Sequence, residues 1–240
     1  MSSTASLPKQ KPSEVRPEVG HMFEHRKYDN ERVKPRKIAF DFPADIPKYY
    51  AGGDPVKSAI LNSINMFLPA WEDVMARTFK DIAANIQDPY LRDQARGFLG
   101  QEAVHGRTHA KFCDNLRAQG YDIDPYMNFC DWFFKDFVEK RLGPQMVVSA
   151  TSSFEHYSDL VILILLDTDF LDDCHPRMKE FFRWHMAEEV EHNSVAFEVL
   201  EYVNNGYWLR QMGNALGLFM ILFFTVGGSF YLIAQDGKLF

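Results

Sequence analysis

The chain has 240 residues, of which 46% are hydrophobic and 15% aromatic, so it can build one large folded domain or two small ones. Its formal net charge of −7 argues against wholesale binding to nucleic acid, and no nucleic-acid partner is expected. Its three cysteines lie far apart without a Cys-x-x-Cys pair, which argues against a disulfide framework and a structural zinc site and suits a reducing cytoplasm.

Residues 1–35 are polar, contain prolines and lack hydrophobic periodicity, so they are predicted to form a flexible tail. They contain no apolar signal-peptide core, so secretion is not indicated and a cytoplasmic protein is expected. Residues 36–54 begin with alternating apolar and polar residues around two prolines. We expect this segment to pack on the domain as an extended arm.

The rest of the chain is predicted to be helical. Each predicted helix opens with a proline at or near its first position, usually just after an aspartate. These prolines are Pro55, Pro89, Pro125, Pro144 and Pro176. Two helix pairs joined by a longer connection, which holds the aromatic helix after Pro125, predict an all-α, ferritin-like four-helix bundle over residues 55–205 with an extra crossover helix. Pro69 falls inside the first helix and is expected to kink or loosen it.

Two copies of one pattern dominate this helical region: a lone Glu on one helix, followed by a Glu-x-x-His on the next. The first copy is Glu72 with Glu102 and His105, and the second is Glu155 with Glu189 and His192. Residues three apart on a helix share a face, so each Glu-x-x-His offers a carboxylate and an imidazole to one ion. A four-helix bundle needs this set of four carboxylates and two imidazoles to hold two metal ions, and burying the six groups without metal would be very costly. The six residues are therefore the predicted metal ligands.

The ligand types also indicate which metals to expect. Carboxylates suit Fe and Mn, and imidazole suits Fe, so the expected cofactor is a pair of metal ions, Fe/Fe or Fe/Mn. Zn or Mn alone is less expected, because the pattern supplies no thiolate for zinc.

Two further histidines lie one turn from the pattern. His109 follows His105 by one turn, and His185 precedes Glu189 by one turn. If the second and fourth bundle helices are antiparallel, both histidines fall on the same side of the metals. Each is a candidate seventh ligand, proton donor or partner of a ligand, and the alternative is a histidine satisfied in the core. Glu188 also permits a second pairing with His192, at a spacing of four.

The C-terminal segment, residues 206–240, differs in kind from the bundle. From Ala215 to Ala234 it contains no charged residue, a run of about 20 residues, which is the length of a transmembrane helix. Two interpretations stay open: a hydrophobic helix that packs in the core or in a homodimer, and an anchor in the inner membrane.

Several segments resemble one known family. They are FLPAWEDVMART, FLGQEAVHGRTHAKF, SSFEHYSD and WHMAEEVEHNSVAFEVL. Together they are similar to the bacterial family of predicted metal-dependent hydrolases, which belongs to the ferritin-like superfamily, over roughly residues 35–210. Trp71 is a departure, because family members more often have glycine directly before this Glu, and its bulk is expected to reshape the pocket beside Glu72.

The resemblance implies an enzyme but leaves the reaction open. Ferritin-like centres of this composition are similar to O2-activating oxygenases, N-oxygenases and desaturases, and a third histidine ligand would strengthen the likeness to arylamine N-oxygenases. The first expectation is an O2-activating di-iron oxidoreductase that acts on a hydrophobic small molecule, with an electron-donor protein as a candidate partner. The alternatives are a hydrolase that uses a metal-bridging hydroxide and a ferroxidase or iron-handling protein.

Overall fold

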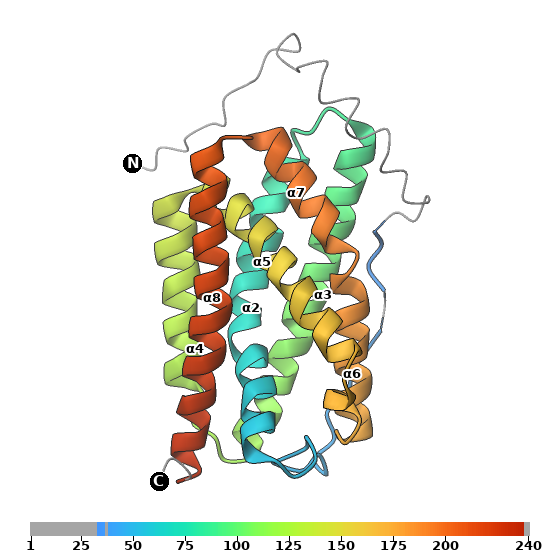
Figure 1. The fold of residues 1–240 in the computed structure, drawn as a ribbon, viewed down its shortest axis with the longest axis vertical. Helices are drawn as coiled ribbons and strands as arrows, with labels where there is room; N and C mark the ends of the chain where they lie inside the picture. Colours follow the sequence, from blue (N-terminus) through green and yellow to red (C-terminus); the bar gives the residue numbers. More distant parts are fainter. Residues whose placement is uncertain (1–32, 37, 238–240) are drawn as a thin grey trace. The chain divides into compact units, whose positions relative to one another are not determined.

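The fold is all-α, which confirms the predicted class. The structure is a computed structural model that describes residues 33–36 and 38–237, apart from the side chain of Asn193. Within these residues the elements are helices and no β-strand forms (Figure 1). Ala51 and Cys174 make an isolated antiparallel bridge. Of the predicted tail, residues 1–32 lie outside the described part of the chain.

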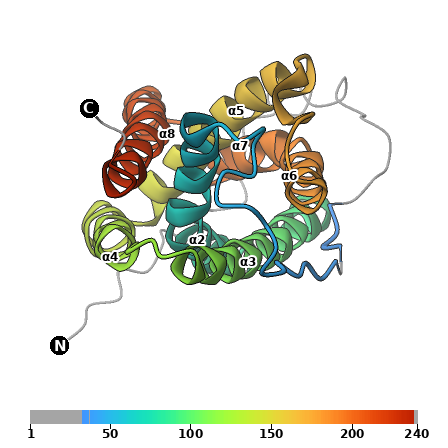
Figure 2. The same cartoon turned by 90° about the horizontal axis from the view of Figure 1, so that it is seen from below.

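The first helix pair begins where the Asp-Pro signals place it. Helix α2 runs over Pro55–Ala83 and α3 over Pro89–Ala118, and the short connection between them lets the two helices pack side by side (Figures 1 and 2). Asp54 and Asp88 cap the two helices by accepting hydrogen bonds from backbone N–H groups of the first turn. These caps satisfy donors that a helix start otherwise leaves free.

The crossover between the two helix pairs consists of an α-helix followed by a π-helix. Helix α4 (Asp124–Asp131) continues directly into the π-helix η2 (Trp132–Leu142), and Gly143, whose φ is +81°, ends it. Helix α5 (Pro144–Leu166) follows, and a short 3-10 turn, η3 (Asp169–Leu171), leads toward the last part of the bundle. The predicted crossover helix is therefore present between the two helix pairs.

The fourth bundle helix is broken, contrary to the prediction of one helix carrying both Glu189 and His192. Helix α6 (Pro176–Glu189) ends in a turn at Val190 and Glu191, and α7 (His192–Val203) starts just after it. No Pro or Gly marks the break. The turn is held from outside the helix, because Glu191 contacts the Arg36 guanidinium and accepts a hydrogen bond from Gln101 Nε2 at 3.0 Å.

Pro69 leaves α2 as one continuous helix, so the expected kink does not interrupt it. Proline has no N–H to donate to the carbonyl of Asn65, four residues earlier. The thiol of Cys113 on α3 donates to that carbonyl instead, at 3.3 Å. A neighbouring helix thus satisfies the group that the proline frees, and the turn before Glu72 stays in place.

The predicted tail ends earlier than residue 35. Val33 is buried, and its N–H donates to Gln94 Oε1 on α3 at 3.1 Å. Gly97 and Gly100 of α3 allow the close approach, since a Cβ at either position would meet Val33 or Pro35 within 2.5 Å. The segment from Val33 onward therefore packs on α3, because small residues there leave room for it.

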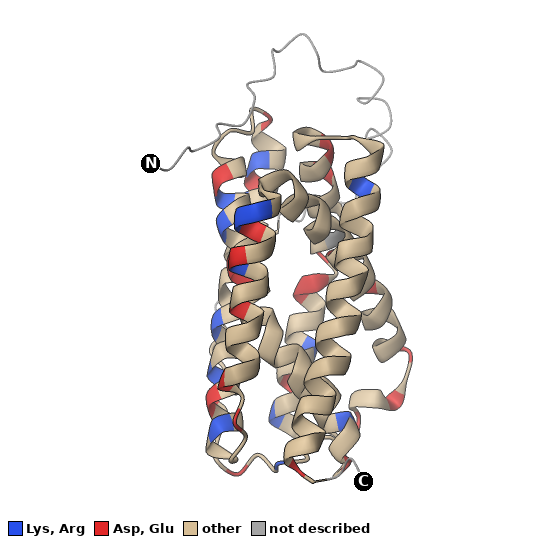
Figure 3. Cartoon of the chain, turned by 90° about the vertical axis from the view of Figure 1, so that its left-hand side faces the viewer, with Lys and Arg blue, Asp and Glu red and all other residues tan. Residues whose placement is uncertain are grey.

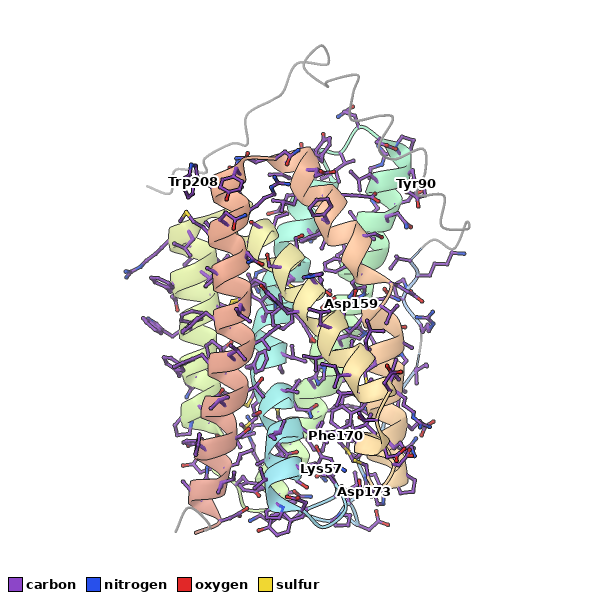
Figure 4. All side chains as sticks on the ribbon, viewed as in Figure 1. Lys57, Tyr90, Asp159, Phe170, Asp173 and Trp208 are labelled. Carbon is purple, nitrogen blue, oxygen red and sulfur yellow. The ribbon has the colours of Figure 1, made fainter. Side chains whose placement is uncertain are left out.

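The end of the bundle where α2 begins is stabilised by contacts with the segment before α6. These contacts come from the first turn of α2 and from the extended segment that precedes it. Lys57 at the start of α2 pairs with Asp173 at 2.5 Å and lies over the ring of Phe170 (Figure 4). The N–H of His175 donates to the carbonyl of Tyr50 at 2.7 Å. These contacts join the start of α2 to the start of α6.

Helix α8 (Tyr207–Gln235) lies along the bundle against α5 and α2 (Figures 1 and 2). Glycines on its buried face allow the close approach: a Cβ at Gly213 would meet Ser149 Oγ at 2.0 Å, and one at Gly228 would meet Ser63 Cβ at 2.7 Å. By length and composition α8 could also cross a membrane, but only 33% of its most apolar window is buried. One face of the helix is therefore packed, and the opposite face is exposed.

Candidate metal centre

The structure brings the six predicted ligands together in the core of the bundle. They come from α2, α3, α5, α6 and α7, and none is more than 5% exposed. On α3, Glu102 and His105 share one face, as their spacing predicts. Glu189 is the last residue of α6 and His192 the first of α7, so the turn between them aims two neighbouring side chains into the same space.

The ligands form two groups, and within a group the ligand atoms lie within 4.8 Å of one another. The first group is Glu72, Glu102 and His105, and the second is Glu102, Glu155, Glu189 and His192. Glu189 also groups with His105 and His185. Glu102 and Glu189 therefore face both halves, which makes them the candidates to bridge two ions, with one lone Glu left for each half.

Atoms without hydrogen-bond partners test whether metal fits here. Both carboxylate oxygens of Glu102 and of Glu155 are buried without a hydrogen bond, as is Nδ1 of His105 and of His192. His192 Nδ1 lies only 2.9 Å from Glu102 Oε1, but the two do not form a hydrogen bond of normal geometry. Buried polar atoms are rarely left unpaired, so donors that converge in this way fit a pair of metal ions.

The pKa values show how the cluster balances its charge without metal. Burial and the charge of Glu102 raise the pKa of Glu72 well above its usual range. Burial opposes the charge of His105, yet the hydrogen bond to Glu188 and the nearby carboxylates of Glu189 and Glu102 raise its pKa to about 9. Burial likewise opposes the charge of His192, but the nearby carboxylates raise its pKa well above normal. Protons therefore supply the positive charge that two metal ions would replace.

Each ligand histidine is held on its far side by a different kind of group. His105 Nε2 contacts Glu188 Oε2 at 2.9 Å, and His192 Nε2 contacts Gln101 Oε1 at 2.9 Å. Arg36 donates to the other oxygen of Glu188 at 3.1 Å. Glu188 is thus turned away from the cluster and belongs to none of its groups, so the geometry favours Glu189 over Glu188 as the partner of His192. The Glu188 carboxylate instead orients His105, and an uncharged amide orients His192.

His109 and His185 lie side by side beside the first group, and a chain of hydrogen bonds fixes their protons. Asn65 Nδ2 donates to Leu61 O at 2.8 Å, so Asn65 Oδ1 accepts from His109 Nδ1 at 2.7 Å. Burial lowers the pKa of His109 well below normal and that of His185 to about 3, so both rings are neutral. His109 Nε2 then accepts from His185 Nδ1 at 3.2 Å. His185 Nε2, 3.4 Å from Glu189 Oε1, is left with a free lone pair toward the cluster.

An apolar cavity of about 100 Å³ extends from the cluster between α2, α5, α6 and α8. Glu72, Glu102, Glu189 and His185 line its buried end. Apart from these four residues, Ser158 and Thr225, every side chain that lines it is apolar. Trp71 does not line the cavity and is fully buried against Phe134 and Phe154, so the expected reshaping of the pocket beside Glu72 by its bulk is not seen in the lining.

Sequence reasoning missed three residues that position the ligands: Arg36, Asn65 and Gln101. Gln101 directly precedes Glu102, and Asn65 lies almost two turns before Glu72 on α2. Asn65 and Gln101 are both fully buried, and a polar residue at a core position of a helix is the signal that could have found them. No local signal marks Arg36, because its partners lie 152 and 155 residues away.

The fold and the cluster define an all-α bundle with His and Glu clusters of the kind that bind metal ions in the bundle core. The pattern of the family described as "Predicted metal-dependent hydrolase" matches residues 34–240. The chain belongs to this family, which confirms the resemblance in its sequence. It matches no curated protein and no solved structure. Placement in the ferritin-like superfamily, and iron as the metal, stay predictions.

Proposed function

We propose that the protein is a dinuclear iron oxidoreductase that uses O2 to oxidise an apolar small molecule. The observation that carries the proposal is a carboxylate-rich cluster at the buried end of a cavity whose other walls are almost entirely apolar. An apolar substrate can be buried in such a cavity without leaving polar groups unpaired. When bound, a pair of irons would supply the redox chemistry with O2, and an oxygenation would take two electrons from a separate donor, such as an electron-donor protein.

The residues of the chain would bind the two ions and orient the substrate beside them. Glu102 and Glu189 face both halves and would bridge the ions, whereas Glu72 and Glu155 would each hold one ion. His185 would be the seventh ligand through Nε2, with His109 and Asn65 fixing its ring. Apolar side chains around the cavity keep water from the reacting end and hold the substrate next to the cluster.

The family description favours a second candidate, metal-assisted hydrolysis. In such a reaction the metals would polarise a carbonyl or phosphoryl oxygen and activate water. That reaction needs polar groups to orient the scissile bond, and outside the cluster the cavity offers only Ser158 and Thr225. The seven candidate donors also leave few open positions for water and substrate. Hydrolysis is therefore the second choice.

Anaerobic loading with Fe(II), followed by O2 and monitored by absorption and Mössbauer spectroscopy, tests the proposal. We expect about two irons per chain, oxidation on exposure to O2, and a signal from coupled irons. Glu102→Ala and Glu189→Ala should abolish that coupled signal. Glu180→Ala is the matched control, because Glu180 lies on α6 with Glu189 but is exposed and pairs with Arg177 at the surface.

The outcomes separate the candidates. Survival of the coupled signal in Glu102→Ala would refute the ligand assignment. A chain loaded with Fe(II) that does not react with O2, together with a zinc-loaded chain that cleaves an activated ester, would establish the hydrolase instead. Oxidation of many irons per chain into a mineral would indicate iron handling.

A further inference from the structure

The exposed face of α8 is apolar from Ala215 to Ala234. Between Arg210 and Asp236 the helix has no charged residue, and Figure 3 shows its ribbon without Lys, Arg, Asp or Glu between the two ends. In this stretch the large apolar side chains that are at least 38% exposed are Leu218, Phe219, Leu222, Phe223, Val226 and Phe230, and Met212 precedes them at 58%. Contiguous exposed apolar patches on a folded protein mark sites that bind another protein or a membrane.

Neighbouring elements extend the same face. On one side, Phe129 and Trp132 of the crossover are 39% and 50% exposed, and Phe129 contacts Phe223 of α8 with ring centroids 6.3 Å apart. Helix α5 also packs against α8, and in its second half Leu160 and Ile164 are 46% and 63% exposed. We call the exposed apolar side chains of α8, the crossover and this half of α5 the apolar face.

The cavity of the candidate metal centre reaches the apolar face. Val161 of α5 lines the cavity and is 41% exposed, so the cavity opens beside it. Ile221 and Thr225 of α8 line the cavity from the other side. The mouth therefore lies between α5 and α8, within the apolar face.

We propose that the apolar face docks on a lipid bilayer, with α8 lying in the plane of the membrane surface and the cavity mouth opening toward the lipid chains. The docking is inferred from the exposed apolar side chains and the position of the cavity mouth, and does not depend on the reaction. Its consequence, that the substrate is a hydrocarbon chain drawn from the bilayer, rests on the proposed function.

Three features favour a bilayer over a second copy of this chain. A second copy would cover the mouth beside Val161 and close the route to the cluster. An apolar helix face that lies in the interface enters the boundary between headgroups and acyl chains without crossing it, and α8 keeps its other face on the bundle. Tyr207 and Trp208 begin α8 and are 60% and 76% exposed, and Figure 4 shows Trp208 at the outer edge of the bundle. Trp and Tyr are enriched at the headgroup level of membranes.

Flotation of the full chain with phosphatidylcholine vesicles tests the docking. The wild type should float with the vesicles whether or not metal is bound. Leu222→Glu places a charge in the centre of the face and should reduce the bound fraction by about tenfold or more. Tyr90→Glu is the matched control and should float like the wild type. Tyr90 is 53% exposed against 55% for Leu222, but it lies on α3, on the side opposite Trp208 in Figure 4.

A spin label at the mouth tests the orientation. The three native cysteines are buried, so a nitroxide can be attached selectively to Val161→Cys or, as a control, to Tyr90→Cys. With vesicles, the label at position 161 should become less accessible to an aqueous nickel chelate and more accessible to O2. The label at position 90 should not change.

Several results would overturn the proposal. One is a wild-type chain that fails to float and stays in the vesicle-free fraction, and another is a Leu222→Glu variant that binds vesicles to the same extent as the wild type. A spin label at position 161 that stays accessible to the nickel chelate while the chain floats would also contradict the proposed orientation. A wild type that is a dimer in solution and ignores vesicles, but becomes a monomer in Leu222→Glu, would show that a second copy covers the face. None of these results depends on iron or O2, so the docking and the proposed function can fail separately.

Discussion

Glu188→Gln tests how the structure holds the first metal position. Glu188 is fully buried, and each of its oxygens receives one donor: His105 Nε2 at 2.9 Å and Arg36 at 3.1 Å. Glutamine keeps the shape but has only one oxygen, so its NH2 must face one of the two donors. The variant therefore loses either the charge-assisted hydrogen bond to His105 or the one to Arg36 Nη1, whereas Arg36 keeps its pair with Glu191.

The loss can be given a magnitude. Hydrogen bonds to charged groups contribute about 1.5–3 kcal/mol, and about 1.4 kcal/mol corresponds to a tenfold change in affinity. A metal ion at the half that contains His105 should therefore bind about 10- to 100-fold more weakly in Glu188→Gln, which agrees with the usual effect of removing a group that orients a ligand histidine. The other half should change little, because Gln101 rather than Glu188 orients His192.

Anaerobic titration with Co(II) in competition with a chelator measures both affinities through the cobalt absorption bands. Glu180→Gln is the matched control, because Glu180 lies on α6 with Glu188 but pairs with Arg177 at the surface and touches neither ligand histidine. An affinity within about twofold of the wild type in Glu188→Gln, or an equal loss in Glu180→Gln, would refute the reasoning.

Three other predictions concern pH, the seventh ligand and the packing of α8. In the metal-free protein, the pKa of His105 is raised to about 9. Its contribution to the free energy of unfolding is therefore complete below about pH 6.5 and is lost as the pH rises through 9. The melting temperature of the metal-free protein should fall between pH 6 and pH 9. A constant or rising melting temperature would contradict this, and metal loading should reverse the trend because ions bind the deprotonated ligands. His185→Phe should weaken metal binding at the first group in the same cobalt titration, and an unchanged affinity would exclude His185 as a ligand. Gly213→Val should lower the free energy of unfolding, measured in urea, by about 1–3 kcal/mol, because the new side chain would meet Ser149. Gly227 has open space around it, so Gly227→Ala should raise the free energy of unfolding by about 0.5–1 kcal/mol. Equal effects of the two substitutions would show that α8 does not pack as described.

The local signals of the sequence located the helices well. Asp54-Pro55 and Asp88-Pro89 predict two helix starts that the structure places at the same residues, because capping and the fixed φ of proline act within a single turn. The break at Val190 and Glu191 was missed. No residue there is a helix breaker, and the turn depends on contacts with Arg36 and Gln101 from other parts of the chain.

The sequence by itself determined which side chains meet in the core. Spacing along a helix sets which residues share a face, and four carboxylates with two imidazoles on apolar faces have few other ways to be buried. Only the tertiary structure decided what surrounds them. The carboxylate behind His105, the amide behind His192 and the hydrogen bond between His109 and His185 each join residues at least 76 positions apart. The same holds for the cavity, which forms only where α5 and α8 pack beside α2. Such long-range contacts leave no periodic trace in the sequence, so packing alone fixes them.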